Sequence, residues 1–131
     1  MSPNTPDKRP QPRNTKGRSK ALDRKVRETA PLFAALGDST RLGIVGRLAG
    51  GAVLSIAALT AGTGVTRQAI TKHLQVLDEV GLVHSAWQGR ERVWSLEPAQ
   101  IDVARETLDL ISAQWTSALE RLAAFVEADP D

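Results

Sequence analysis

The stretch from Thr66 to Val80 carries the kinds of side chain that bind duplex DNA, and it carries them on one face. At about 100° per residue, five polar side chains of this stretch fall within an arc of about 140°. They are Arg67, Gln68, Thr71, Lys72 and Gln75. Arg and Gln present forked donors and acceptors to base edges, whereas Lys and Thr reach phosphates or thymine methyl groups. Because the opposite arc is mostly apolar, the pattern predicts a helix that packs on one side and reads a DNA groove with the other.

The residues just before this helix predict a helix-turn-helix. Ser55 is a candidate N-cap for a short helix over 56–61, and Thr66 is a candidate N-cap for the helix that follows. Residues 62–64, which include two glycines, form the turn between them, and a very short strand is expected over 53–54. Two short helices joined in this way are typical of DNA-binding proteins, although they also occur in proteins that never bind nucleic acid.

The segment after Gly81 alternates between apolar and polar residues on both sides of a turn at 88–91, as the strands of a β-hairpin do. Two basic side chains are expected at its tip, within reach of a neighbouring minor groove or its phosphates: Arg90 and Arg92. Three side chains are expected to seat the hairpin on the body: Trp87, Val93 and Trp94. In the alternative, the two arginines only solvate the turn and pair with Glu91. A reading helix followed by a basic hairpin predicts a winged helix.

Two further helices are expected before the helix-turn-helix. The first runs over 21–37, and Pro31 is expected to kink or restart it. The second is capped at residue 38 or 39 and continues to residue 49. Arg41 lies in its first turn and is expected to pair locally with Asp38 in preference to DNA. Both helices are interpreted as scaffold.

The last helix, opened by Pro98, has an apolar residue at alternating spacings of three and four. Its seam consists of Ile101, Ala104, Leu108, Ile111, Trp115, Ala118, Leu122 and Phe125. About 28 residues at 1.5 Å each give roughly 42 Å, which exceeds the core of one small domain and leaves apolar surface for a partner. The residues assigned to a dimer interface are Leu108, Ile111, Trp115, Ala118, Leu122 and Phe125. In the alternative, the whole seam is internal to one chain.

Charge is placed unevenly along the chain. Residues 1–27 hold nine Lys or Arg against two Asp, a net of +7, whereas residues 28–131 hold eight against thirteen acids, a net of −5. Residues 1–20 contain four prolines and six basic residues, which predicts a disordered basic tail ahead of one domain over 21–131. The tail is interpreted as a solubilising extension, with an arm that follows DNA phosphates as the alternative.

The amino-acid composition excludes several kinds of functional site. The chain has no Cys, which excludes disulfides, thiolate metal sites and a cysteine nucleophile. It has no glycine-rich phosphate loop and no local grouping of Ser, His and carboxylate, so no enzymatic activity is expected. His84 is expected to be exposed and without a companion for metal ligation or catalysis, and His73 to be partly buried and hydrogen-bonded. No apolar run suits a membrane span or a secretory signal, so a cytoplasmic protein without membrane contact is expected.

Residues from about Leu32 to Leu96, about half of the chain, resemble the ArsR-type winged-helix transcriptional regulators. ALGDSTRLGIVGRL resembles the opening helix pair of that family, LSIAALTAGTGVTRQAITKHLQVLDEVGLV its helix-turn-helix, and QGRERVWSLEP its wing. The resemblance implies a homodimer that binds double-stranded DNA, typically a repressor that leaves its operator when an effector binds. Together with the hairpin residues, the positions carried over give the expected DNA-binding set: Thr66, Arg67, Gln68, Thr71, Lys72, Gln75, Arg90 and Arg92.

The chain departs from the metal-sensing members of that family. Ile56 and Ala57 occupy the region where those members place thiolates, and the last helix has Asp102, Glu106 and Asp109 without a histidine. No metal and no cofactor are therefore expected. The effector that the resemblance implies would be an unknown small molecule, with a site near Trp115 as one option and simple core packing of that ring as the favoured one.

The sequence thus predicts a mainly α fold with a small β-hairpin, a winged helix-turn-helix with a long C-terminal dimerisation helix. The predicted function is a sequence-specific DNA-binding transcriptional regulator, a homodimeric repressor on an inverted-repeat operator. The alternative is a winged-helix protein-interaction module that does not bind DNA. A protein-docking face would expose anchors such as Leu or Trp, whereas this helix face is polar and cationic, which favours DNA.

Overall fold

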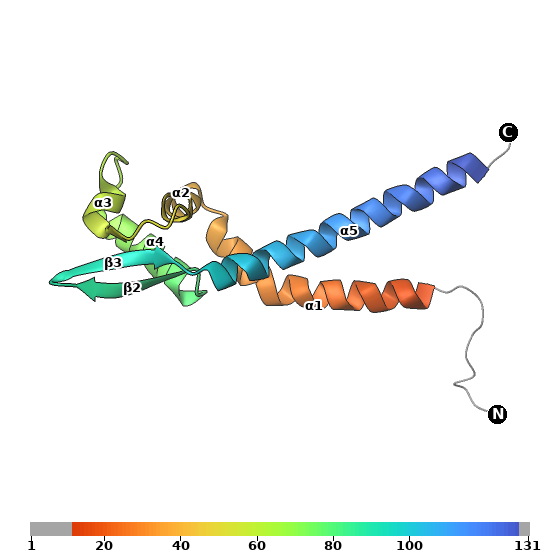
Figure 1. The fold of residues 1–131 in the computed structure, drawn as a ribbon, viewed down its shortest axis with the longest axis horizontal. Coiled ribbons are helices and arrows are strands. Elements are labelled where there is room, and N and C mark those ends of the chain that lie inside the picture. The colour runs from red at the N-terminus through yellow and green to blue at the C-terminus, as the bar shows by residue number, and fades with distance from the viewer. Residues whose placement is uncertain (1–11, 129–131) are drawn as a thin grey trace, which may run out of the picture.

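The structure, a computed structural model, describes residues 12–128, with side chains from residue 20 onward. Its elements are α1 (Pro12–Leu36), α2 (Ser39–Leu48), β1 (Leu54–Ser55), α3 (Ile56–Thr60), α4 (Arg67–Glu79), β2 (Val83–Gln88), β3 (Glu91–Leu96) and α5 (Pro98–Ala128). Figure 1 shows α2, α3, α4 and the sheet gathered at one end of an elongated molecule, from which α1 and α5 extend in opposite chain directions. The predicted mainly α winged helix with a long last helix is confirmed.

Helix α1 begins earlier than expected and continues through Pro31. It begins at Pro12, so residues 12–20 are helical where a disordered tail was expected, and residues 1–11 of that tail lie outside the described residues. Pro suits the first turn of a helix because its missing N–H has no partner there anyway. Pro31 lies inside the helix and does not restart it. Burial of the neighbouring Leu32 and Ala35 in the core stabilises the helix across this proline.

Three side-chain caps set the starts of the helices in the compact end. Asp38, Ser55 and Thr66 each accept the backbone N–H three residues ahead, at 3.0 to 3.1 Å. These caps satisfy helical N–H groups that have no intrahelical partner, and each was expected from the sequence. The helices they start are held together by a common core of almost fully buried side chains: Ile44, Leu48, Leu59, Ile70, Leu74, Leu77 and Leu82.

The hairpin belongs to a three-stranded antiparallel sheet in the order β1-β3-β2. Gly89, with a φ of 68°, forms the tight turn that joins β2 to β3. Trp94 and Val93 are buried and seat the sheet on the body as expected. The same expectation was wrong for Trp87, which is 71% exposed. It pairs in register with Arg92, one step from the turn, and therefore lies beyond the edge of the helices that cover the base of the sheet.

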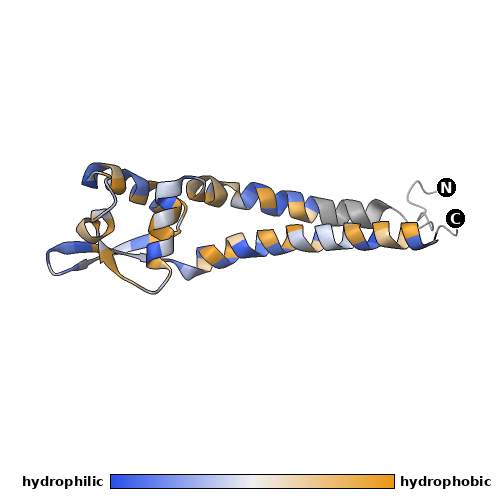
Figure 2. Ribbon diagram, turned by 90° about the horizontal axis from the view of Figure 1, so that it is seen from above, coloured by the Kyte–Doolittle hydropathy of each residue, from blue (hydrophilic) through white to orange (hydrophobic). Residues whose placement is uncertain are grey.

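Among residues 20–128, the buried contacts between α1 and α5 lie near the compact end. The Thr107 hydroxyl donates to Thr29 Oγ1 at 3.1 Å in a fully buried contact, and Lys25 pairs with Glu106 at 3.2 Å at the surface. No residue of α5 after Thr107 is buried. Figure 2 shows apolar residues recurring along α5 to its far end, beyond the part that packs. The alternative in which the whole seam is internal to one chain is therefore wrong.

Candidate nucleic-acid interface

Helix α4 separates a buried face from a polar face. Ile70, Leu74 and Leu77 are essentially inaccessible to solvent on its inner side. On its outer side Arg67, Gln68, Lys72 and Gln75 are exposed, and Thr71 is half-buried. The inner side fixes the position of the helix, because burying each of these three side chains contributes roughly 2 kcal/mol to the stability of the fold. The outer side is left to interact with another molecule.

Most side chains of the outer face of α4 have hydrogen-bond donors and acceptors that no described residue uses. Among residues 20–128, no side-chain hydrogen bond or ion pair uses Arg67, Gln68, Lys72 or Gln75. Thr71 differs, because its hydroxyl donates to the carbonyl oxygen of Arg67 at 2.8 Å. Thr66 Oγ1 accepts the cap hydrogen bond, and its hydroxyl hydrogen can still donate to a phosphate. The face thus combines free forked groups with a helix N-terminus, and both are suited to a polyanion.

A polar cluster behind α4 joins it to α1 and α2. Arg41 Nε donates to the carbonyl oxygen of Ala35 at 2.6 Å, and Arg41 Nη1 lies 3.3 Å from His73 Nδ1. His73 is partly buried, as expected. The Arg41 guanidinium does not pair with Asp38 as predicted, because it turns toward α1 and α4. Asp38 instead accepts the backbone N–H of Arg41, which lowers the pKa of this carboxyl, and the charges of Arg41 and His73 lower it further.

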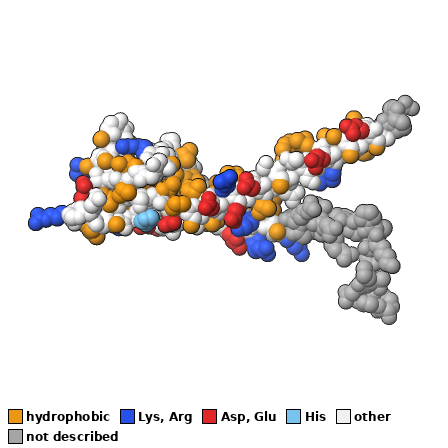
Figure 3. Space-filling model, in the orientation of Figure 1, with side chains coloured by type: hydrophobic (Ala, Val, Ile, Leu, Met, Phe, Trp, Pro, Cys, Tyr) orange, Lys and Arg blue, Asp and Glu red, His pale blue; other side chains and the backbone are white. Residues whose placement is uncertain are grey.

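The two arginines of the hairpin have different surroundings. Arg92 Nε donates to Ser85 Oγ at 2.8 Å, and its guanidinium lies 4.9 Å from the centre of the Trp94 ring. Arg90 lies in the turn and is exposed. Figure 3 shows basic side chains projecting from the end of the molecule that carries the hairpin tip. Neither arginine forms an ion pair with Glu91 within the described part of the chain, so the pairing that the alternative expected is not seen there.

The reading helix and the hairpin lie at the same end of the molecule. Figure 1 shows the hairpin tip and the turn between α3 and α4 pointing away from the free ends of α1 and α5. The expected DNA-binding residues therefore fall on two elements of one end: six on α4 and its cap, and two on the hairpin. The exposure of Trp87 on that hairpin was not expected from the sequence, although its position one residue before the turn was the available signal.

His84 is exposed, as expected, but it is not alone. Ser95 Oγ lies 2.9 Å from His84 Nε2, and Glu97 Oε2 lies 3.3 Å from His84 Nδ1. Cross-strand pairing places Ser95 opposite His84, whereas the expectation concerned companions for metal ligation or catalysis. The three residues lie on the outer face of the sheet, where water solvates them. We interpret them as a link from β2 to the start of α5.

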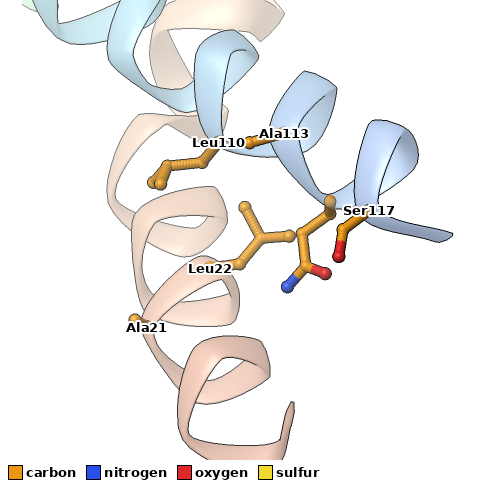
Figure 4. A pocket seen from close by; sticks show the side chains of 6 residues that line it. Ala21, Leu22, Leu110, Ala113 and Ser117 are labelled. Carbon is orange, nitrogen blue, oxygen red and sulfur yellow. The ribbon is translucent and has the colours of Figure 1, made fainter. Parts of the chain in front are cut away.

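The far half of α5 forms a second surface of different character. Five of the six residues assigned to the dimer interface are exposed although apolar: Leu108, Ile111, Trp115, Leu122 and Phe125. Ala118 is half-buried. Where α1 and α5 part, an apolar groove of about 310 Å³ opens between Leu22 of α1 and Leu110 of α5. Figure 4 shows both leucine side chains directed into this gap.

Two other classes of site are not found among the described residues. No three His, Asp or Glu side chains from residues 20–128 come together in a way that would hold a metal ion. Over the same part of the chain, every helix is too short or too polar to cross a bilayer.

Comparisons with known proteins agree with this architecture. A family model described as a helix-turn-helix domain matches residues 36–86. The HTH-type transcriptional regulator Rv2034 of Mycobacterium tuberculosis is 37% identical, over 76% of this chain and 89% of the relative. The structure of an ArsR-like transcriptional regulator from Rhodococcus sp. RHA1 is 40% identical, with a TM-score of 0.64, over 79% of this chain and 93% of that one. The transcriptional repressor BigR from Xylella fastidiosa, at 22% identity and a TM-score of 0.57, shares the fold over 72% of this chain and 94% of its own.

Proposed function

The chain belongs to the ArsR-type winged helix-turn-helix transcriptional regulators, and from this premise we propose that it is a homodimeric repressor that binds an inverted-repeat operator. DNA binding follows from the family. The proposal adds which residues read the sequence, how the copies assemble and what the bound protein does.

The polar face of α4 is the observation that supports sequence reading. Arg67 and Gln68 lie in its first turn, exposed and without an internal side-chain partner in the described residues, so they can form forked hydrogen bonds with base edges. Lys72 and Arg90 supply positive charge for phosphates, which orient the protein without reading sequence. Thr66 at the helix start adds a hydroxyl donor for a phosphate.

The exposed apolar face of α5 supports a twofold dimer. Singly exposed apolar side chains are ordinary on a monomer, but five large ones along one helix are a typical interface. A second copy of α5 covers them. The dimer then presents two α4 helices to successive major grooves, about 34 to 36 Å apart on one side of the duplex.

In this proposal the protein represses transcription by occupying the operator. A dimer bound across an operator that overlaps a promoter excludes polymerase from that DNA. A small-molecule effector, which the family resemblance implies, would act by favouring a dimer whose reading helices no longer match the groove spacing. The groove between Leu22 and Leu110 lies beside the dimer surface and, at about 310 Å³, suits a small apolar ligand.

The experiment that tests this function is selection of bound genomic fragments by the purified protein, followed by affinity measurements on the selected duplex. Arg67→Ala and Gln68→Ala should each reduce preference for the selected sequence over a mixed one, by on the order of 1 to 3 kcal/mol. Lys72→Ala is the matched control on the same face, because it should weaken both duplexes alike. Unchanged discrimination in Arg67→Ala and Gln68→Ala would show that α4 does not read bases through these residues.

A promoter-shift assay distinguishes DNA binding from the alternative function, a protein-interaction module. If the chain were a protein-interaction module, the promoter of its own gene and the selected fragments would not shift at physiological salt. The cationic outer face of α4 argues against that role, because protein-docking surfaces use aromatic or aliphatic anchors at their centre.

A further inference from the structure

Trp87 is the most exposed large apolar side chain among the described residues of the compact end, and no other part of the described chain covers it. It lies at the outer end of β2, next to Gln88, and 71% of its surface is accessible to solvent. An indole in water forgoes the free energy of burial that Trp94, on the neighbouring strand, obtains at 2% exposure. An exposed aromatic side chain beside basic residues is a common element of binding surfaces.

The strand register places Trp87 in a row of alternating rings and charge. Trp87 pairs with Arg92 and Ser85 pairs with Trp94, so all four side chains emerge on one face of the hairpin. Trp94 forms the buried inner end of the row. The guanidinium of Arg92 lies 4.9 Å from the centre of the Trp94 ring, and its Nε is hydrogen-bonded to Ser85. Trp87 forms the outer end of the row. It lies next to the guanidinium of Arg92, which Trp94 and Ser85 hold in position on its inner side.

The charge around this indole is positive. Arg92 is its cross-strand neighbour, and Arg90 lies in the turn. Glu91, the carboxylate nearest in sequence, pairs with Gln88 and therefore emerges on the opposite face of the hairpin. Two such tips from two copies of the chain would repel each other, which disfavours a second copy as the occupant of this face. A polyanion with flat apolar edges fits both its charge and its ring.

We propose that Trp87 is a DNA-contacting residue of the hairpin, which packs its indole against sugars and base edges of the minor groove beside the major groove read by α4. Arg90 and Arg92 contact the flanking phosphates. The hairpin lies at the same end of the molecule as α4, as this placement requires (Figure 1). Aromatic and apolar side chains contact minor grooves through shape and stacking, and their contribution depends little on salt. The inference rests on the proposed function and adds a non-ionic contact to it.

The test measures binding of the full chain to a mixed-sequence duplex over about 50 to 200 mM salt. Trp87→Ala should weaken binding about fivefold to tenfold, which is about 1 to 1.4 kcal/mol and lies at the lower end of the cost of removing an aromatic contact with nucleic acid. The dependence of log affinity on log salt should keep the wild-type slope, since no charge is lost. Arg90→Ala should instead reduce that slope by about one.

Two matched controls isolate the indole. Trp87→Phe keeps an aromatic ring and should bind within about twofold of wild type. Gln88→Ala, the next residue along on the other face of β2, should likewise change little. Because Trp87 is mostly exposed, Trp87→Ala should unfold at the wild-type temperature, and thermal melts check this.

Several results would overturn the inference. Wild-type affinity in Trp87→Ala would do so, and so would an altered salt slope, which would mean that the effect is electrostatic. A loss of self-association with unchanged DNA affinity would identify Trp87 as a contact between copies. If Arg67→Ala and Gln68→Ala relax sequence preference while Trp87→Ala has no effect, only this inference fails. If wild type binds no duplex, the proposed function fails with it.

Discussion

Helix α4 and the far half of α5 are both exposed, and they differ in what the rest of the chain does for them. In α4 the inner face is buried, the first turn is capped by Thr66, and the polar outer face faces solvent. In α5 no residue beyond Thr107 is buried, and the exposed side chains of this stretch include eight large apolar ones. The first surface is complete within one chain, because water solvates its polar groups well. The second is incomplete, because water is a poor environment for Leu, Ile, Trp and Phe.

The difference indicates what each surface binds. Water solvates the polar side chains of α4 well, so this face is stable without a partner. It can therefore bind and release a polyanion reversibly. An apolar face of this length gains by permanent coverage, which suits a second copy of the chain. In the proposed function one of these surfaces serves reversible binding and the other serves assembly, and the following changes separate the two.

The largest expected effect comes from a charge on the assembly surface. Leu122→Glu should dissociate the dimer and lower affinity for the selected operator by two to four orders of magnitude, since binding through two linked sites gains about that much. Sedimentation measures assembly, and anisotropy measures affinity. Leu42→Glu is the matched control, because Leu42 on α2 is 55% exposed and Leu122 is 59% exposed. Equal behaviour of the two variants would place the dimer contact elsewhere.

The next effect contrasts two adjacent residues of α4. Leu74→Ala removes a fully buried side chain and should lower the free energy of unfolding by about 2 to 5 kcal/mol. Gln75→Ala, on the outer face, should leave unfolding within about 0.5 kcal/mol of wild type and weaken DNA binding only. Denaturant melts and affinity measurements on both proteins check this contrast. Destabilisation by Gln75→Ala would mean that the outer face also packs.

A smaller effect is expected at the start of α4. Thr66 Oγ1 accepts the backbone N–H of Ala69 at 3.1 Å, and Thr66→Ala should cost about 1 kcal/mol of stability. Thr66→Asn keeps an N-cap acceptor and should recover most of that loss. Thermal melts distinguish the two variants. If Asn fails to restore stability, the cap is not what Thr66 contributes.

The smallest expected effect concerns acid stability. The Arg41 backbone N–H lowers the pKa of Asp38 below its ordinary value of 3.8. The ionised carboxylate therefore stabilises the fold above the unfolded pKa, and this stabilisation is lost as pH falls through the lowered native pKa. The stability difference between wild type and Asp38→Asn should shrink from about pH 5 to about pH 2 and stay constant near neutrality. A difference that grows on acidification would contradict this assignment.

Local chemistry made much of the architecture predictable from sequence. Caps at Asp38, Ser55 and Thr66, the turn at Gly89 and the two-faced pattern of α4 depend on residues a few positions apart. The sequence could not place long-range contacts. The pairing of β1 with β3 and the group formed by His84, Ser95 and Glu97 depend on tertiary register.

The errors have the same origin. Trp87 was assigned to packing because it is aromatic, yet a residue one step from a hairpin turn lies past the edge of the body. Arg41 was predicted to pair with the nearest acid in the sequence. In the fold its guanidinium instead contacts a backbone carbonyl of α1 and the ring of His73. Pro31 was expected to kink or restart α1, and the helix does not restart there, because tertiary burial of its neighbours outweighed the lost hydrogen bond.

The central claim is that two α4 helices, held by one dimer, read one duplex. The most direct test varies the centre-to-centre distance between two selected half-sites and measures affinity at each spacing. The account predicts a maximum near 10 to 10.5 base pairs or a multiple of it, with a sharp fall when one half-site turns to the far side of the helix. Affinity that is the same at every spacing would contradict it.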